Sequence, residues 1–383
     1  MSEQAKILSP NVVLAMMALA ALAAVRALLP IEGPPDSDFA LFLYPWMDVI
    51  RERGLASIAG GFSEYTPPYI YLLNVAVFLE PAVGTLAAIK LVNLPFVIAC
   101  AFGIGAIVRE VSGDKALGTT AAAVGIVCPS LLINAFAFGQ CDAIFTGFLL
   151  WFVYFAMREK PALACLMFGL AVSFKAQAMF LAPLLLALWL CGRIGLRHAL
   201  LIPATYAALM LPAAIAGRPW TELLTVYVRQ SDVMHELSLN APNPWWFLRH
   251  LMDYPVGLAV GLAAGVAATA LIAWRAKRLR PDAFTILLVA TVAAAVLPWV
   301  LPKMTARYFI VADLLTIALA FARPRLWFVA VLVQVGSVIA IVSDFFVPWG
   351  TASVAFGPIT LGVAVLAFEL FRTGDMQRRE TRA

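Results

Sequence analysis

Charged residues are scarce in this chain of 383 residues: 13% are Asp, Glu, Lys or Arg, whereas 63% are hydrophobic. A soluble domain is roughly half apolar and about a quarter charged, and the mean hydropathy here is +0.91. The composition excludes an ordinary soluble protein and predicts a polytopic membrane protein with helical apolar segments. The net charge of +5 does not indicate nucleic-acid binding, because the basic residues fall between apolar segments, where they set topology.

Cysteine is also rare, and nucleotide-binding motifs are missing. The five cysteines are odd in number, fall mostly inside apolar runs and have neither metal-ligand spacing nor a disulfide pattern. We expect them to be small core residues. No Walker motif, kinase-type glycine loop or Gly-x-Gly-x-x-Gly after a strand occurs, so no nucleotide site is predicted.

Long apolar runs dominate the chain and predict about 12 transmembrane helices (11–13). They cover approximately 10–30, 86–108, 116–135, 140–157, 161–175, 178–192, 198–216, 256–274, 282–301, 308–322, 326–343 and 352–371. The first run follows Lys6 and resembles a signal peptide, but it lacks a small-residue cleavage site and is interpreted as a retained span. The whole chain, 1–383, is expected to be one integral membrane domain.

Charge and parity predict the orientation. If both termini are cytoplasmic and the short apolar stretch 69–83 is an interfacial or re-entrant helix, most of the 27 Lys and Arg residues lie inside. Counting 69–83 as a span would move the later basic loops outside. The long loops, about 31–85 and 217–255, are then extracytoplasmic, and the protein lies in the cell (inner) membrane.

The first outer loop carries two acids, Asp36 and Asp38, just after the first span. Such a carboxylate could remove a proton from an acceptor hydroxyl, or it could cap the helix that follows. Downstream, residues 44–54 are typical of an amphipathic surface helix. An acid pair such as Asp36 and Asp38 can hold a divalent ion, but two carboxylates in one loop are too few to predict a metal site, and the sequence requires no cofactor.

Other polar motifs fall on the same predicted face. Glu64 and Tyr65 precede Pro67-Pro68, which makes a rigid turn. Gln140 and Asp142 open the fourth predicted span, either for hydrogen bonds to sugar hydroxyls or, for Asp142, as a favourable charge at a helix N-terminus.

Cations and aromatic residues complete this set. Lys175 and Gln177 interrupt a long apolar run, where the lysine suits a phosphate or a buried acid, or snorkels to the surface. Lys303 and Arg307 suit phosphate oxygens or lipid headgroups. Trp245 and Trp246 could stack on a sugar or anchor in the membrane interface.

In order and spacing, these motifs resemble the GT-C superfamily of membrane glycosyltransferases, and most of all bacterial relatives of the GPI mannosyltransferase II family. The stretches that carry the resemblance are Asp38-Phe39 with Tyr44-Pro45-Trp46, Tyr65-Thr66-Pro67-Pro68-Tyr69, Gly139-Gln140-Cys141-Asp142, Lys175-Ala176-Gln177, Asn243-Pro244-Trp245-Trp246 and Pro302-Lys303-Met304 with Arg307-Tyr308.

The resemblance implies a GT-C fold and inverting transfer of a hexose, mannose among the candidates, from a polyprenyl-phosphate donor to a lipid- or glycan-linked acceptor outside. It implies Asp38 as the catalytic base, with Asp36 as second choice. Lys303, Arg307 and Lys175 would bind the donor phosphate. The residues implied for sugar or acceptor binding are Gln140, Asp142, Glu64, Tyr65, Gln177, Trp245 and Trp246. The partners are membrane lipids and these substrates, not nucleic acid.

The chain departs from the family pattern Met-His-Glu-Arg-Tyr, because Thr305 and Ala306 stand where His and Glu would be. This departure concerns sugar specificity more than reaction class. The competing interpretations are a GT-C transferase of an amino-pentose, another pentose or a whole glycan, a 12-span secondary transporter or lipid flippase, and a non-catalytic assembly factor. Against a transporter, no internal repeat is evident and the polar groups gather on one face.

Overall fold

The computed structural model describes residues 9–33, 37–346 and 352–380, and this part of the chain is almost entirely helical. The α-helices are α1 (Pro10–Leu28), α2 (Tyr44–Arg53), α3 (Pro67–Val83), α4 (Thr85–Leu91), α5 (Leu94–Ser112), α6 (Lys115–Ile126), α7 (Pro129–Leu132), α8 (Asp142–Met157), α9 (Pro161–Phe174), α10 (Ala182–Leu190), α11 (Leu196–Ala199), α12 (Leu201–Ile215), α13 (Trp220–Asp232), α14 (Trp245–Leu248), α15 (Tyr254–Lys277), α16 (Ala283–Val300), α17 (Ile310–Ala322), α18 (Trp327–Phe346) and α19 (Ala352–Glu380). Shorter elements are the π-helical turns η1 (Phe39–Leu43) and η3 (Ile133–Ala137), the 3-10 helices η2 (Gly54–Ala59), η4 (Ala176–Leu181) and η5 (Pro324–Leu326), and the strands β1 (Ser238–Leu239) and β2 (Met304–Thr305).

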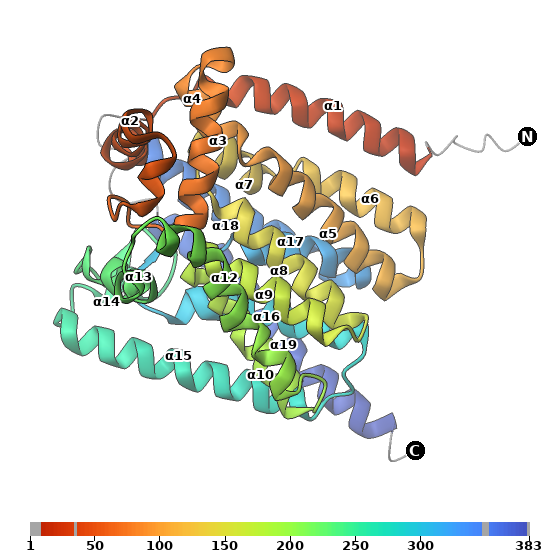
Figure 1. Cartoon of the computed structure of the whole chain (residues 1–383). Coiled ribbons are helices and arrows are strands. Elements are labelled where there is room, and N and C mark those ends of the chain that lie inside the picture. The colour runs from red at the N-terminus through yellow and green to blue at the C-terminus, as the bar shows by residue number, and fades with distance from the viewer. Residues whose placement is uncertain (1–8, 34–36, 347–351, 381–383) are drawn as a thin grey trace, which may run out of the picture.

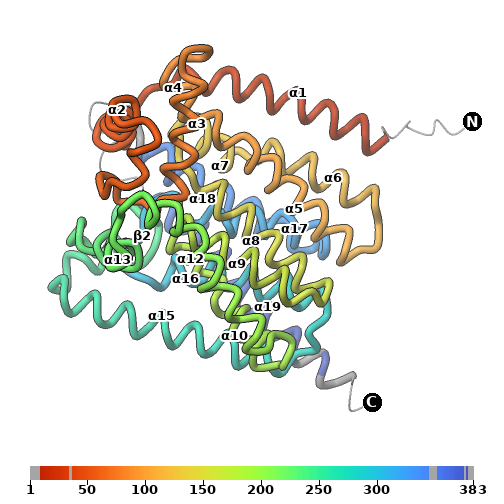
Figure 2. Tube along the Cα trace, viewed as in Figure 1, coloured from red at the N-terminus to blue at the C-terminus, as the bar shows by residue number. Residues whose placement is uncertain are grey.

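The long helices form a bundle with two distinct ends (Figure 1). One end carries α2, α3, α13 and α14, which come from the two long loops of the sequence. The Cα trace shows that the start of α1 and the end of α19 both lie at the opposite end (Figure 2). Helix α3 runs across the first end instead of along the bundle.

Seven described helices are long and apolar enough to cross a membrane, or up to eight if the bent pair Lys115–Ile126 and Pro129–Ala137 is one span. Five further apolar helices are shorter, namely Pro67–Val83, Asp142–Met157, Pro161–Phe174, Ala176–Leu190 and Ile310–Ala322. The protein is therefore an all-α polytopic membrane protein, and the twelve spans stay a prediction. Several spans that are continuous apolar runs in the sequence are bent or shortened by breaks.

One such break separates α9 from η4, as the sequence predicts around 175–177. Lys175 adopts an extended conformation with φ −152° and ψ 137°, so the helix ends at Phe174. The carbonyl oxygen of Ser173 accepts a hydrogen bond of 2.6 Å from the hydroxyl of Thr66. A polar partner from the first long loop thus compensates a backbone group near the break.

The first long loop is folded into helices. Helix α2 buries Trp46, Met47 and Ile50 on one face and ends at Gly54, whose φ of 54° favours glycine. Helix α3 begins with Pro67 at its first position, where the missing amide hydrogen leaves no intrahelical bond unmade.

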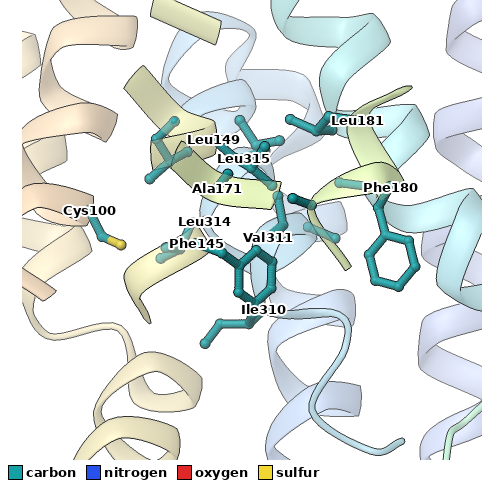
Figure 3. Packing of buried hydrophobic residues seen from close by; sticks show 14 of the residues in the cluster. Cys100, Phe145, Leu149, Ala171, Phe180, Leu181, Ile310, Val311, Leu314 and Leu315 are labelled. Atoms are coloured by element: carbon teal, nitrogen blue, oxygen red, sulfur yellow. The ribbon is translucent and has the colours of Figure 1, made fainter. Parts of the chain in front are cut away.

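The core lies where α5, α8, α9, η4 and α17 meet (Figure 3). Phe145, Leu149, Ala171, Val311 and Leu314 are among the fully buried side chains at this crossing. Helices α16 and α17 are apolar on nearly all sides, which is typical of helices surrounded by other helices. By contrast α1 is mostly exposed, as expected for a helix that faces lipid.

A short parallel pairing joins two distant segments at the end of the bundle that carries α13. Ser238 pairs with Met304 and Leu239 with Thr305. The second long loop is thereby fixed beside the loop that precedes α17, so both contribute to one surface.

Candidate active site

A cavity of about 740 Å³ opens at the end of the bundle that carries α2, α13 and α14. Its wall is built from segments far apart in the sequence. The residues predicted for catalysis or binding that line it are Asp38, Glu64, Tyr65, Gln140, Gln177, Lys303 and Arg307. The motifs of the first loop, the 139–142 turn, the 175–177 break and the 302–307 loop therefore meet at one site.

Asp38, from the first loop, contacts residues of two other motifs, the 139–142 turn and the 302–307 loop. Its Oδ2 accepts a hydrogen bond of 2.6 Å from Nε2 of Gln140 and lies 3.2 Å from Nη1 of Arg307. Asp38 stands at the start of η1 but makes no side-chain capping bond there. Because its side chain keeps 38% exposure at the cavity, the carboxylate is held in place and accessible. Asp36 lies outside the described residues.

Asp142 and Lys175 form a buried ion pair, with side-chain exposures of 0% and 1%. Oδ2 of Asp142 also accepts a hydrogen bond of 2.9 Å from Asn134 and lies 3.6 Å from Nε of Arg307. These polar partners offset part of the cost of removing two charges from water. Neither residue is part of the cavity wall. Of the partners that the sequence analysis considered for Lys175, the structure shows a buried acid, Asp142.

Arg307 links the buried pair to the cavity, because it contacts both Asp142 and Asp38. Charges alternate along Lys175, Asp142, Arg307 and Asp38, so each charge has an opposite neighbour. Such an arrangement stabilises ionised side chains where water is scarce.

Aromatic side chains form one wall of the cavity. Tyr65 packs edge-on against Trp46 and Tyr69, with ring centroids 5.4 Å and 5.1 Å apart. Beside it, burial and the neighbouring Asp38 charge raise the pKa of the Glu64 carboxyl. Oε1 of Gln177, another residue of the wall, has no hydrogen-bond partner among the described residues. These groups can stack on a sugar ring and bind its hydroxyls.

Lys303 lines the cavity in a conformation that is unusual for lysine, with φ of 62°. Its ammonium donates to the carbonyl oxygens of Ser231 and Met234 and, over 2.8 Å, to the hydroxyl of Tyr254. The three donors of a lysine are therefore engaged. Lys303 ties the end of α13 to the start of α15 beside the cavity.

Trp245 and Trp246, predicted to stack on sugar or anchor in the interface, are not part of the cavity wall. The indole Nε1 of Trp245 donates to the carbonyl oxygen of Val300 over 2.6 Å. The guanidinium of Arg249 stacks on the ring of Trp246, with its Cζ 3.6 Å from the ring centroid. Both indoles pack within the protein instead.

The match to known proteins covers much of this site. Residues 61–191 match the family model described as "Alpha-(1->6)-mannopyranosyltransferase, N-terminal domain". Over this segment, about a third of its length, the chain is similar to this mannosyltransferase family. The matched segment includes Glu64, Tyr65, Gln140, Lys175 and Gln177, whereas Asp38 and Arg307 lie outside it. No curated protein matches the chain.

The structure also explains the departure at Thr305 and Ala306. Ala306 is 1% exposed and clusters with Ala340 and Ala355, so a glutamate side chain at 306 would have no space. Thr305 pairs with Leu239 and lines the cavity, and its hydroxyl has no partner among the described residues.

Sequence reasoning did not single out Asn240, Arg249 and Asp344, which also line the cavity. Nδ2 of Asn240 donates to Oδ1 of Asp344 over 2.6 Å, and Asn240 has a positive φ of 58°. An acid at the end of an apolar run on the predicted outer face was a usable signal for Asp344. The described residues contain no group of three or more His, Cys, Asp or Glu that could hold a metal ion.

Proposed function

We propose that this protein is an inverting mannosyltransferase that uses a polyprenyl-phosphate-mannose donor on the extracytoplasmic side. The acceptor is a hydroxyl of a lipid- or glycan-linked sugar. The match of residues 61–191 to a mannosyltransferase family supports the sugar. The description of that family also supports an α-(1→6) linkage, in which the acceptor is a primary 6-hydroxyl.

The observation that carries the proposal is the state of Asp38 in the cavity. Its carboxylate is accessible and is held by Gln140 and Arg307. In the reaction, Asp38 takes the proton of the acceptor hydroxyl as the oxygen attacks the anomeric carbon. The bond from that carbon to the phosphate oxygen breaks, and polyprenyl phosphate leaves with the bonding electrons. Asp142 is a weaker candidate for the base because it is fully buried and bound to Lys175 and Asn134.

Cations stabilise the negative charge that develops on the leaving phosphate. Arg307 and Lys303 line the cavity and are the proposed contributors from the 302–307 loop. Lys175 is proposed to act through Asp142, which it holds against Arg307. Gln140, Glu64, Gln177 and Tyr65 are proposed to bind sugar or acceptor hydroxyls, with Tyr65 also offering a ring face.

The proposal is tested by sugar transfer with the purified protein reconstituted in lipid. Polyprenyl-phosphate donors carrying mannose, glucose or arabinose are offered with extracted membrane lipids and glycans, and products are followed by mass spectrometry. We expect mannose transfer and release of polyprenyl phosphate. Asp38→Asn should lower transfer by about a hundredfold or more, in line with the loss of a general base.

Asp48→Asn is the matched control, because Asp48 lies on neighbouring α2, is 66% exposed and is not part of the cavity wall. It should leave transfer unchanged. Transfer that survives in Asp38→Asn would remove Asp38 from the role of base. Transfer of arabinose in preference to mannose would favour the pentose alternative, and substrate flux without transfer would favour a transporter.

A further inference from the structure

The cations of the cavity differ in how far their charges are already compensated. Arg307 contacts Asp38 and Asp142. Lys303 has its three donors engaged by two carbonyl oxygens and a hydroxyl. A third cation of the wall, Arg249, has no carboxylate partner among the described residues. It is therefore the cation with most capacity left for an anionic ligand.

Arg249 is also held in a defined orientation. It follows α14 directly and lies flat on the indole of Trp246, 3.6 Å from the ring centroid. Its Nε donates to Nε2 of His250 over 3.2 Å. Within the described chain, no hydrogen bond reaches its two terminal nitrogens. A guanidinium stacked on an aromatic ring keeps its planar fork ready for two oxygens of one phosphate.

Part of the same cavity wall is apolar and belongs to a helix with exposed apolar side chains. Leu258 and Leu262 of α15 line the cavity, and Leu262 is 51% exposed. Val260 and Val266 on the same helix are 48% and 71% exposed. The cavity that Arg249 lines thus also offers an apolar surface along which the hydrocarbon chain of a phosphate ligand can pack.

We infer that Arg249, supported by Trp246, binds the phosphate of the isoprenoid donor. This inference rests on the proposed function. Inversion requires the base and the leaving phosphate on opposite sides of the anomeric carbon. Asp38 precedes α2 and Arg249 follows α14, and Figure 1 shows these two helices as separate parts of the same end of the bundle. Arg249 then stabilises the charge of the departing phosphate together with Arg307 and Lys303.

Direct binding of a short probe tests the inference without sugar transfer. Farnesyl phosphate, farnesol and inorganic phosphate are titrated into the detergent-solubilised full chain, and Kd is measured by microscale thermophoresis. We expect wild type to bind farnesyl phosphate more tightly than the other two, since it alone offers both the phosphate and the chain. Arg249→Gln should weaken farnesyl phosphate binding about tenfold or more and leave farnesol unaffected.

The structure offers a matched control in the same helix bundle. Arg278 also stacks on an indole, that of Trp274, at 3.7 Å, but it is not part of the cavity wall. Arg278→Gln should bind the probe as wild type does. Arg249→Lys keeps the charge but loses the fork, so its Kd should fall between those of wild type and Arg249→Gln.

Equal farnesyl phosphate binding by wild type and Arg249→Gln would overturn the inference and leave Arg307 and Lys303 as the phosphate ligands. Equal binding of inorganic phosphate and farnesyl phosphate by wild type would also overturn it, because the site would then be a general anion site. These results are separate from the proposed function, whose test is the loss of transfer in Asp38→Asn. Either of these binding results would overturn the inference even if mannose transfer were observed.

Discussion

At the residue scale, the site depends on a row of alternating charges whose exposure increases from the buried pair to Asp38. Lys175 and Asp142 are buried, Arg307 is 19% exposed and Asp38 is 38% exposed. The buried pair therefore positions Arg307, and Arg307 together with Gln140 positions Asp38. The local sequence predicted these residues as site candidates but not which of them contact one another, since Asp38 and Gln140 are 102 positions apart.

Lys175→Met should destabilise the protein by about 3–5 kcal/mol, because it leaves Asp142 charged without its closest partner. Adding Asp142→Asn should recover part of that loss, since neither charge then remains unpaired. Thermal unfolding in detergent measures the effect as a lower Tm. Arg158→Met is the control: it breaks the ion pair between Arg158, 47% exposed, and Glu110, 25% exposed, and should lower Tm far less. Equal losses in Lys175→Met and Arg158→Met would contradict the importance of the buried pair.

At the element scale, the cavity depends on how helices and loops end. The break at Lys175 brings its ammonium to Asp142, and the positive φ of Lys303 directs it to the end of α13. The β1–β2 pairing fixes the second long loop beside the 302–307 loop. The break was predictable because a lysine interrupts an apolar run. The strand pairing was not, because two residues in each of two distant loops leave no periodic signal.

Close packing of α15 against the 302–307 loop is the second feature at this scale. A Cβ added at Gly261 would lie 2.6 Å from Pro302 and 2.7 Å from Trp245, closer than real contacts allow. The glycine thus lets α15 approach the segment that carries Lys303 and Arg307.

Gly261→Ala should destabilise the protein by about 1–3 kcal/mol through overpacking and should also lower mannose transfer by moving the 302–307 loop. Gly357→Ala in α19 is the matched control, because no described atom lies within 4 Å of the position that a Cβ would take there. Alanine at 357 should be neutral or slightly stabilising, since it is the better helix former. Thermal unfolding and the transfer assay measure both variants. If the Gly261→Ala protein were as stable as Gly357→Ala, α15 and the 302–307 loop could move apart without cost, and the expected overpacking would be wrong.

At the scale of the whole molecule, the two ends of the bundle differ in chemistry. One end holds the cavity, and the other holds the basic turns between helices, including Arg109, Lys115, Arg158 and Lys160 near the ends of α5, α6, α8 and α9. The positive-inside rule then supports a cytoplasmic basic end and an extracytoplasmic cavity.

Cysteine labelling in intact cells tests this orientation. Four native cysteines are buried, so Cys191→Ser provides the background. Leu251→Cys, at a position that is 78% exposed at the cavity end, should react with a membrane-impermeant maleimide in intact cells. Leu196→Cys, at a position that is 70% exposed beside the basic end, should react only after permeabilisation. The reverse pattern would invert the proposed topology and put the cavity in the cytoplasm.

The sequence by itself determined the membrane class, the helical architecture and several polar residues of the cavity wall, because hydropathy, charge and helix breaks are local properties of the chain. Only the tertiary structure decided which groups meet. In the tertiary structure Lys175 forms an ion pair with Asp142, Lys303 donates to backbone carbonyl oxygens, and the ring of Trp246 stacks with the guanidinium of Arg249. Such partners depend on how helices far apart in sequence pack, and a lysine or tryptophan has the same local pattern whether it meets a ligand or another part of the chain.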